Sequence, residues 1–332
     1  MSEVILKVKK LKKHFDISGG ILDQIRFKRG KLVREQTIVK ALNKVSFEVK
    51  RGEIFSVVGE SGCGKSTLGR TILKLYEPDE GQIYFNNQQI DHLSTKQMLP
   101  FRTKMQMIFQ DPYASLNPRK TVYQTLEEPV SFHYPHLSKA EVKTKIDEVM
   151  KQVGLDPNWK KRFPHEFSGG QRQRISIARA LIVKPEFIVA DEPISALDVS
   201  IQAQILNLLM EAQKQHNLSY LFITHDLAVV EHISTRVAVM YLGKICELAP
   251  TKDLFHNPMH PYTQALLSAI PKIGAQGLNY IKLKGEIPTP INLPSGCVFH
   301  PRCPYAIPQC EQEIPKLKKT NNSYVACHKV NS

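Results

Sequence analysis

The chain has 332 residues, enough for roughly two domains, and its 42% hydrophobic and 23% charged residues are ordinary for a soluble globular protein. Its formal net charge of +14 is compatible with binding to nucleic acid, an anionic membrane surface or a nucleotide ligand. Basic residues that are spread along a chain, however, usually lie on the solvated surface. No apolar run approaches the ~18 residues that a membrane span needs, so we do not expect a transmembrane helix.

The basic N-terminus predicts a strand and not a targeting signal. Val4, Leu6 and Val8 alternate with other residues, and neither an apolar signal region nor a small-residue cleavage site follows. We therefore expect the chain to stay in the cytosol, where stable disulfides are disfavoured.

The first half of the chain begins with strand patterns and ends with a helical one. Residues 41–60 predict two strands joined by a turn at Arg51–Gly52. Residues 81–90 predict another strand with an Asn-Asn turn. Apolar residues at helical spacing predict a helix from Ser138 to Val153.

The second half predicts a parallel sheet followed by a hairpin. Residues 186–192 and 220–226 are typical of buried parallel strands, and residues 205–217 between them are typical of an amphipathic helix. Residues 236–250 predict a hairpin. Prolines then become frequent, and the helical pattern is confined to residues 262–270.

Residues 59–66, Gly-Glu-Ser-Gly-Cys-Gly-Lys-Ser, match the phosphate-binding loop G-x-x-x-x-G-K-[ST], with an apolar strand before it and a helix after it. The glycines let backbone N–H groups surround phosphate oxygens at a helix N-terminus. Lys65 is expected to reach the β- and γ-phosphates and Ser66 to hold Mg²⁺, whereas Cys63 contributes small size and not thiol chemistry. The predicted ATP-binding residues are Gly59, Ser61, Gly62, Cys63, Gly64, Lys65, Ser66 and Thr67.

An acidic pair ends the apolar run of residues 186–192. Asp191 is expected to bind Mg²⁺, directly or through water, and Glu192 to polarise the attacking water. A strand that ends in Asp-Glu is by itself unremarkable, so the significance of this pair depends on its neighbours.

A second anion site is predicted at residues 168–171, Ser-Gly-Gly-Gln, just upstream of the acidic pair. Ser168 is a good N-cap, Gly169 and Gly170 free the backbone, and a long helix follows from Gln171. Glycine pairs alone are usually turns, but this motif continues as Gln-Arg-Gln-Arg before the acidic strand.

Together these motifs resemble the ATPase subunit of an ABC transporter over essentially the full length of the chain. The resemblance implies that two subunits sandwich two ATP molecules, with Ser168, Gly169, Gly170 and Gln171 of one subunit closing over the γ-phosphate held by the other. Phe167 stands where the family usually has Leu, a mild apolar change.

The same resemblance assigns roles to further residues. It implies that Gln110 contacts Mg²⁺ and the attacking water, and that His225 contacts the γ-phosphate. It implies that Ser195 and Asp198 communicate across the dimer. Catalysis is thus expected from Glu192, His225 and Gln110, and magnesium binding from Ser66, Gln110 and Asp191.

The adenine-stacking residue is not assigned. The family often places an aromatic residue shortly upstream of the phosphate loop, but the segment between Lys28 and Val45 has none. Phe27 lies in an apparent insertion at residues 19–37, and Val39 offers only an aliphatic contact.

Three further stretches resemble the ATPases of oligopeptide and dipeptide importers, whose relatives also serve nickel and some other substrates. They are residues 108–119, the segment around His260-Pro261-Tyr262, and residues 288–306. The His-Pro-Tyr segment alone predicts a proline-initiated helix.

Four of the six cysteines lie in the tail, at Cys297, Cys303, Cys310 and Cys327. In the cytosol such a group suggests a metal more than disulfides. The irregular spacing, without a C-x₂-C pair, favours an iron–sulfur cluster over zinc, with unligated thiols as a third alternative. The pattern resembles the tail of the importer subfamily, and this resemblance implies a four-iron [4Fe-4S] cluster, which some members carry. Arg302 and Lys329 are expected to offset the thiolate charge.

The predicted fold is α/β: a P-loop NTPase core with an antiparallel β subdomain and a helical subdomain at about 111–175, plus a small Cys-containing C-terminal segment. Residues 1–250 form the expected nucleotide-binding domain and residues 251–332 the C-terminal domain.

The expected function is ATP hydrolysis that powers import of short peptides. The expected partners are two transmembrane permeases, a second ABC ATPase that makes a heterodimer, and an extracytoplasmic substrate-binding protein. The expected location is the cytoplasmic face of the cell (inner) membrane.

Two alternatives are import of nickel or another small solute by the same machinery, and a soluble ABC protein outside transport. The soluble proteins usually carry paired cassettes or a long coiled-coil insertion, which the sequence lacks. No nucleic-acid partner is expected, because no basic patch contains aromatic stacking positions.

Overall fold

The computed structural model describes residues 3–18, 25–28, 31–34, 36–270 and 281–330. Part of the insertion predicted at residues 19–37, including the side chain of Phe27, lies outside the described residues.

The described chain divides into two compact units. The first contains the described residues of Met1–Ile5, Val49–Ser56 and His92–Thr224. The second contains those of Leu6–Glu48, Val57–Asp91 and His225–Ser332. The domain boundary near residue 250 stays a prediction.

The first unit contains a buried parallel sheet. Strands β8 (Met105–Ile108), β9 (Phe187–Asp191) and β10 (Ser219–Ile223) are consecutive neighbours, with Ile108 opposite Ala190 and Ile223 opposite Asp191. Every residue of β9 and β10 is buried, which explains why their sequences are mostly apolar. Helix α7 (Val199–His216) joins β9 to β10, as predicted.

Helices of the first unit begin at clear capping signals. Helix α5 (Lys139–Gln152) has a capping box between Ser138 and Glu141, and it buries Val142, Ile146, Val149 and Met150 as the periodicity predicts. The other helices of this unit are α2 (Leu99–Lys104), α3 (Pro112–Ser115), α4 (Val122–His133), α6 (Gly169–Leu181) and the 3₁₀ turns η1 (Pro157–Lys161) and η2 (Pro164–Glu166).

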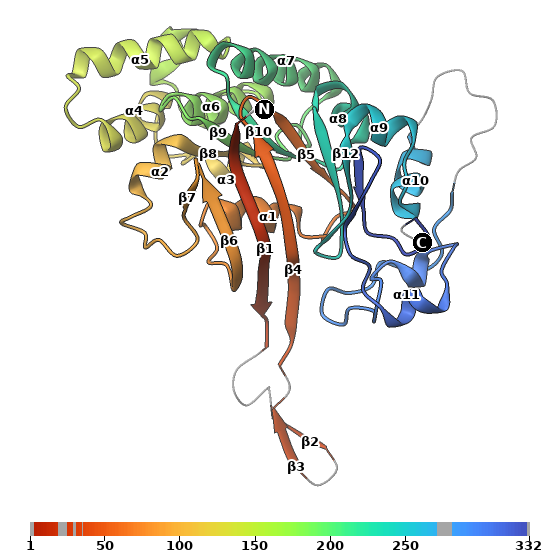
Figure 1. Ribbon diagram of the computed structural model, residues 1–332. Helices are drawn as coiled ribbons and strands as arrows, with labels where there is room; N and C mark the ends of the chain where they lie inside the picture. The colour runs from red at the N-terminus through yellow and green to blue at the C-terminus, as the bar shows by residue number, and fades with distance from the viewer. Residues whose placement is uncertain (1–2, 19–24, 29–30, 35, 271–280, 331–332) are drawn as a thin grey trace. The chain divides into compact units, whose positions relative to one another are not determined.

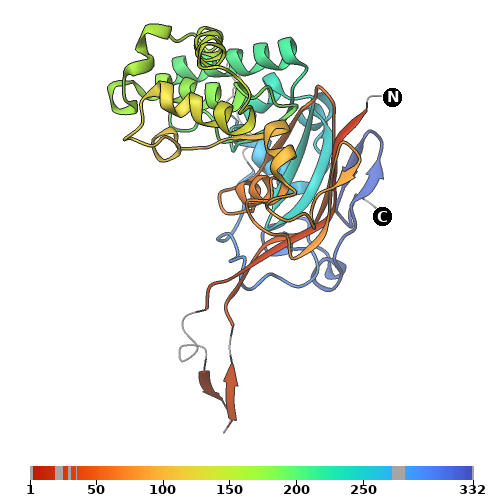
Figure 2. The ribbon, with the colours of Figure 1, turned by 90° about the vertical axis from the view of Figure 1, so that its left-hand side faces the viewer.

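The second unit contains the predicted antiparallel subdomain. Its strand order is β4 (Ile38–Lys50), β1 (Val4–Asp16), β6 (Glu80–Phe85) and β7 (Gln88–Gln89). Figure 2 shows the long strands β1 and β4 side by side in red and orange. Asn86 and Asn87 have φ values of 48° and 62°, so the Asn-Asn turn is confirmed. A separate hairpin pairs β2 (Ile25–Lys28) with β3 (Lys31–Arg34).

The predicted hairpin at 236–250 is also confirmed, as β11 (Arg236–Tyr241) and β12 (Lys244–Pro250). The tail extends this sheet, because β14 (Ser323–Val325) pairs with β12, and β13 (Lys318–Thr320) pairs with β14. The short helices of this unit are α1 (Lys65–Ile72), α8 (Leu227–Ile233), α9 (Thr251–His256), α10 (Pro261–Ser268), α11 (Pro308–Gln312) and the 3₁₀ turn η3 (His300–Arg302).

The prediction that helix after residue 250 is confined to 262–270 is wrong, because α9 and α11 also form. Helix α9 has too few residues to display a period in the sequence. It is stabilised by tertiary contacts: Leu254 is fully buried, and Thr251 Oγ1 donates to the Ser234 carbonyl at 2.8 Å.

Strand β5 (Ile54–Val58) is buried along its whole length and leads into the phosphate loop, which α1 follows as predicted. Among the residues that the structure describes, no helix combines the length and apolar character required to span a membrane.

Candidate nucleotide site and cysteine cavity

Glycines shape the phosphate loop in the second unit. Gly59 and Gly64 have φ values of 151° and 104°. A Cβ atom on Gly59 would lie 2.2 Å from the Met240 carbonyl oxygen, and one on Gly64 would lie 2.3 Å from the Ala41 carbonyl oxygen. The loop is therefore pressed against neighbouring backbone at both ends, where a side chain does not fit.

Lys65 is held inside this loop. Its Nζ donates to the carbonyl oxygens of Gly59 at 2.8 Å and Glu60 at 3.1 Å, and the residue is only 5% exposed. Cys63 Sγ lies 4.0 Å from the same nitrogen, and burial raises the pKa of the Cys63 thiol. A thiol with a raised pKa stays protonated, which disfavours nucleophilic chemistry at Cys63.

Three predicted catalytic or magnesium-binding residues lie in the first unit. Gln110 comes two residues after β8, Asp191 ends β9, and Glu192 follows it. Because β8 and β9 are parallel neighbours, Gln110 and Glu192 lie at the same edge, and Gln110 Nε2 donates to Glu192 Oε2 at 3.0 Å. Asp191 is fully buried.

The backbone at Glu192 has an unusual conformation. Glu192 has a φ of 45°, an unusual value for a residue other than glycine, and its N–H donates to the Ile223 carbonyl at 2.9 Å. A non-glycine residue in this conformation costs free energy, and such strain often occurs at functional sites.

Ser168 caps α6 in the predicted way. Its Oγ accepts from the Gln171 N–H at 3.3 Å, and Gln171 Oε1 accepts from the Ser168 N–H at 3.0 Å. A Cβ atom on Gly170 would lie 2.6 Å from Ile201 Cγ2 on α7. Phe167 is buried and packs edge-on against Trp159 with centroids 6.1 Å apart, which explains why an aromatic residue is accommodated there.

Ser195, Asp198 and His225 are exposed. Ser195 Oγ donates to the Glu192 carbonyl at 3.1 Å, and Asp198 is the N-cap residue of α7. His225 follows β10 by two residues and belongs to the second unit. The structure thus brings Gln110 together with Glu192, and Ser195 with the Glu192 backbone, within the first unit.

The His-Pro-Tyr segment forms the start of α10, with Pro261 at its first turn, as predicted. The fully buried Tyr262 donates its N–H to His260 Nδ1 at 3.0 Å, and burial lowers the pKa of His260 to about 4. Glu247 on β12 accepts the N–H groups of Met259 and His260, both at 2.9 Å.

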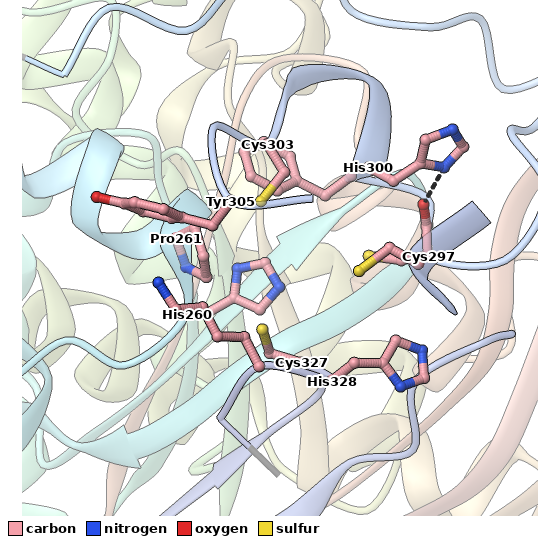
Figure 3. A pocket seen from close by; sticks show the side chains of 11 residues that line it. His260, Pro261, Cys297, His300, Cys303, Tyr305, Cys327 and His328 are labelled. Atoms are coloured by element: carbon pink, nitrogen blue, oxygen red, sulfur yellow. Dashed lines mark hydrogen bonds between the residues drawn. The ribbon is translucent and has the colours of Figure 1, made fainter. Parts of the chain in front are cut away.

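The four tail cysteines line one small cavity, together with His260, His300 and His328. Figure 3 shows the sulfur atoms of Cys297, Cys303 and Cys327 pointing into this space. The Cys297 N–H donates to the Cys310 carbonyl at 2.8 Å, so two of the cysteine-bearing segments are in direct contact.

Burial raises the pKa of the Cys297 thiol to about 11 and also raises that of Cys303. Within the described ranges, no group of three or more His, Cys, Asp or Glu side chains is arranged to hold a single metal ion.

Of the two expected counter-charges, Lys329 lines the cavity and Arg302 is directed to the phosphate loop. Lys329 places its Nζ 3.9 Å from the centre of the Tyr305 ring. Arg302 instead forms an ion pair with Glu60 of the phosphate loop, and this pairing raises the pKa of the Arg302 guanidinium. The sequence had no signal for that long-range pair, so Glu60 and its partners were missed.

The fold and the phosphate loop define a P-loop ATP-binding cassette. The family described as "ABC transporter" matches residues 42–195, and the family described as "Oligopeptide/dipeptide transporter, C-terminal region" matches residues 246–310. A dimeric structure of the ATP-binding cassette MJ0796, bound to ADP and Pi after hydrolysis, matches with a TM-score of 0.63 and 29% identity. This match covers 74% of our chain and 98% of that chain.

Curated relatives match along the whole chain. The oligopeptide transport ATP-binding protein AppF of Bacillus subtilis is 53% identical, over 98% of this chain and 97% of AppF. The di/tripeptide transport ATP-binding protein DppF of Pseudomonas aeruginosa is 46% identical, over 98% of both chains. The chain therefore belongs to the ATP-binding proteins of ABC transporters, in the oligopeptide and dipeptide branch, which confirms the resemblance inferred from the motifs.

Proposed function

We propose that the chain binds and hydrolyses ATP to power import of short peptides through partner permeases. The observation that carries the hydrolytic role is the hydrogen bond from Gln110 Nε2 to Glu192 Oε2. The relatives named for oligopeptide and di/tripeptide transport support short peptides as the transported substrate.

In this proposal Glu192 is the general base. Its carboxylate takes a proton from a water molecule that Gln110 and His225 position, the water oxygen attacks the γ-phosphorus, and the bond to the ADP oxygen breaks. Lys65 and the loop N–H groups hold the β- and γ-phosphates. Ser66, Gln110 and Asp191 are oxygen donors suited to Mg²⁺, which would neutralise developing phosphate charge.

We propose Phe15 as the ring that stacks on adenine. Phe15 is partly buried near the end of β1, and its ring packs edge-on against Tyr76 at 5.2 Å. The neighbouring His14 Nε2 lies 3.1 Å from Asn43 Oδ1. Asn43 N–H donates to the Gly243 carbonyl, and Gly243 N–H donates to the Cys63 carbonyl, so this strand end is linked to the phosphate loop.

The dimer proposal places the capped N-terminus of α6 over a second subunit's ATP. Ser168, Gly169, Gly170 and Gln171 would contact that γ-phosphate, and Ser195 and Asp198 would communicate across the interface. We propose a heterodimer with a second, similar ATPase, together with two permeases and an extracytoplasmic substrate-binding protein. The complex would place this chain on the cytoplasmic face of the inner membrane.

We propose that Cys297, Cys303, Cys310 and Cys327 hold a [4Fe-4S] cluster, with zinc as the alternative. All four line one cavity, and cysteine thiolates are the usual ligands of both centres. Thiolates of a cluster bind different irons, so they need not converge on one point as the ligands of a single ion do. Iron and zinc analysis of protein purified without oxygen tests this: zinc without iron refutes the cluster, and no metal refutes both.

Reconstitution tests the transport proposal. The chain, co-purified with its permeases and placed in proteoliposomes with the binding protein, should take up labelled short peptides only with ATP. Uptake of nickel and no peptide would favour the alternative cargo. If the chain hydrolyses ATP but no permease co-purifies with it, the alternative of a soluble ABC protein would be favoured.

A further inference from the structure

Glu60 is a carboxylate within the phosphate loop, and it is held by the tail. Arg302 Nη1 donates to Glu60 Oε2 at 2.7 Å, and Nη2 donates to Oε1 at 3.1 Å. The Arg302 side chain is 8% exposed and that of Glu60 is 24% exposed, so this two-pronged ion pair is largely shielded from water. Such a pair fixes orientation as well as charge.

The backbone of Glu60 is fixed by other side chains. Its N–H donates to the Tyr262 hydroxyl at 3.0 Å, and that hydroxyl donates to Glu60 Oε2 at 3.3 Å. Its carbonyl accepts from Lys65 Nζ at 3.1 Å. The tail and the His-Pro-Tyr segment therefore meet at one residue of the phosphate loop.

Arg302 is itself held in place by the cysteine-bearing segment. It ends η3, one residue before Cys303, and its N–H donates to the Phe299 carbonyl at 3.0 Å. Phe299 is buried against Tyr241 and Tyr262, and its ring centroid lies 5.3 Å from the ring centroid of each. The guanidinium thus has a fixed position relative to the loop.

A carboxylate in this loop is unfavourable for an anionic ligand. The loop surrounds phosphates, and like charges close together in a partly shielded site repel each other strongly. An arginine held on the carboxylate removes most of that repulsion and keeps the side chain in one orientation.

We propose that Arg302 is a positioning residue of the ATP site: by holding and neutralising Glu60, it lets the phosphate loop accept the charged phosphates, and it makes the cysteine-bearing tail part of that site. This inference rests on the ATP-binding role of the loop, but it does not require any metal in the cysteine cavity.

The test compares nucleotides that differ only in phosphate number. Dissociation constants of AMP, ADP and ATP are measured for the full chain and for Arg302→Met, Glu60→Gln and the double variant. For Arg302→Met we expect ATP to bind about tenfold more weakly, ADP less affected, and AMP within about twofold of the parent. In the double variant, ATP affinity should return to within about threefold of Glu60→Gln.

Lys318→Met is the matched control, because it removes one exposed positive charge from the same tail on β13. It should leave all three dissociation constants unchanged. If Arg302→Met does not fold, Arg302→Lys keeps the charge and loses the two-pronged geometry, and it should weaken ATP binding by about threefold while leaving AMP binding unchanged.

Equal losses for AMP and ATP would mean that Arg302 only supports the fold, and would overturn the inference. So would the absence of rescue by Glu60→Gln, or an ATP affinity unaffected by either Arg302 variant. If the parent chain binds none of the nucleotides, the proposed ATP site itself is wrong, and the two failures are thus distinguishable.

Discussion

The hydroxyl of Tyr262 offers a sharp test of how the phosphate loop is held. Tyr262→Phe keeps the ring, so packing against Tyr241 at 4.8 Å and Phe299 at 5.3 Å is retained. Burial raises the pKa of the Tyr262 phenol, so the hydroxyl is protonated at neutral pH and can donate to Glu60. The substitution therefore removes two hydrogen bonds and little else.

The free energy lost in Tyr262→Phe can be calculated from these two hydrogen bonds. The Glu60 N–H is partly buried, so losing its acceptor costs about 1 kcal/mol. The bond to the carboxylate contributes about another 1 kcal/mol, because Arg302 still holds that group. A total of about 2 kcal/mol corresponds to a roughly 30-fold change in a local opening equilibrium.

Amide hydrogen exchange measures this opening directly. The Glu60 N–H should exchange about 30-fold faster in Tyr262→Phe than in the parent. Tyr241→Phe is the control, because its hydroxyl accepts from Arg302 Nη1 at 3.5 Å, a distance at the limit of a hydrogen bond. We expect less than about threefold acceleration there. Equal exchange rates in the two variants would contradict this account of the loop.

Three other changes have defined outcomes. Glu192→Gln should keep ATP affinity and reduce turnover by about 10³-fold in the assembled complex, and near-normal turnover would remove Glu192 as the base. Gly170→Ala should lower the unfolding temperature, because its Cβ would lie 2.6 Å from Ile201 Cγ2, and Ile201→Ala in the same chain should restore part of the loss. Cysteines bind metal as thiolates, and burial raises the pKa of the Cys297 thiol to about 11. Bound metal should therefore be retained better near about pH 9 than near about pH 6. Metal analysis that finds better retention near about pH 6 would argue against cysteine ligation.

Local patterns in the sequence predicted most of the fold. Apolar runs predicted β9 and β10, because a strand that is buried on both faces has few polar residues. Apolar residues at helical spacing predicted α5, because one face of that helix is buried. Helix α9 left no such trace, since six residues are fewer than two helical turns. The tail strands β13 and β14 are also too short for a period, and they form by pairing with β12.

The candidate site was predictable where a motif is contiguous. Residues 59–66 and the Ser168–Gln171 cap could be found from spacing alone, because each needs particular residue types at fixed neighbouring positions. The Arg302–Glu60 pair joins residues 242 positions apart, and nothing in either local sequence indicates the other. Phe15, which we propose for adenine stacking, lies on β1, outside the segment between Lys28 and Val45 where the family often has an aromatic residue.

The contacts at Glu60 also suggest why the His-Pro-Tyr segment and the tail occur on one chain with the cassette. Tyr262 supports the loop backbone, Arg302 supports the Glu60 carboxylate, and Phe299 packs against both Tyr241 and Tyr262. The Phe299 carbonyl accepts from the Arg302 N–H, and the same turn leads into Cys303 of the cavity. Anything that orders the cysteine-bearing segment therefore also orders a charge partner of the phosphate loop. On this reasoning the tail acts on ATP binding through Arg302, and a change at the cysteines should affect nucleotide affinity only to the extent that it moves η3.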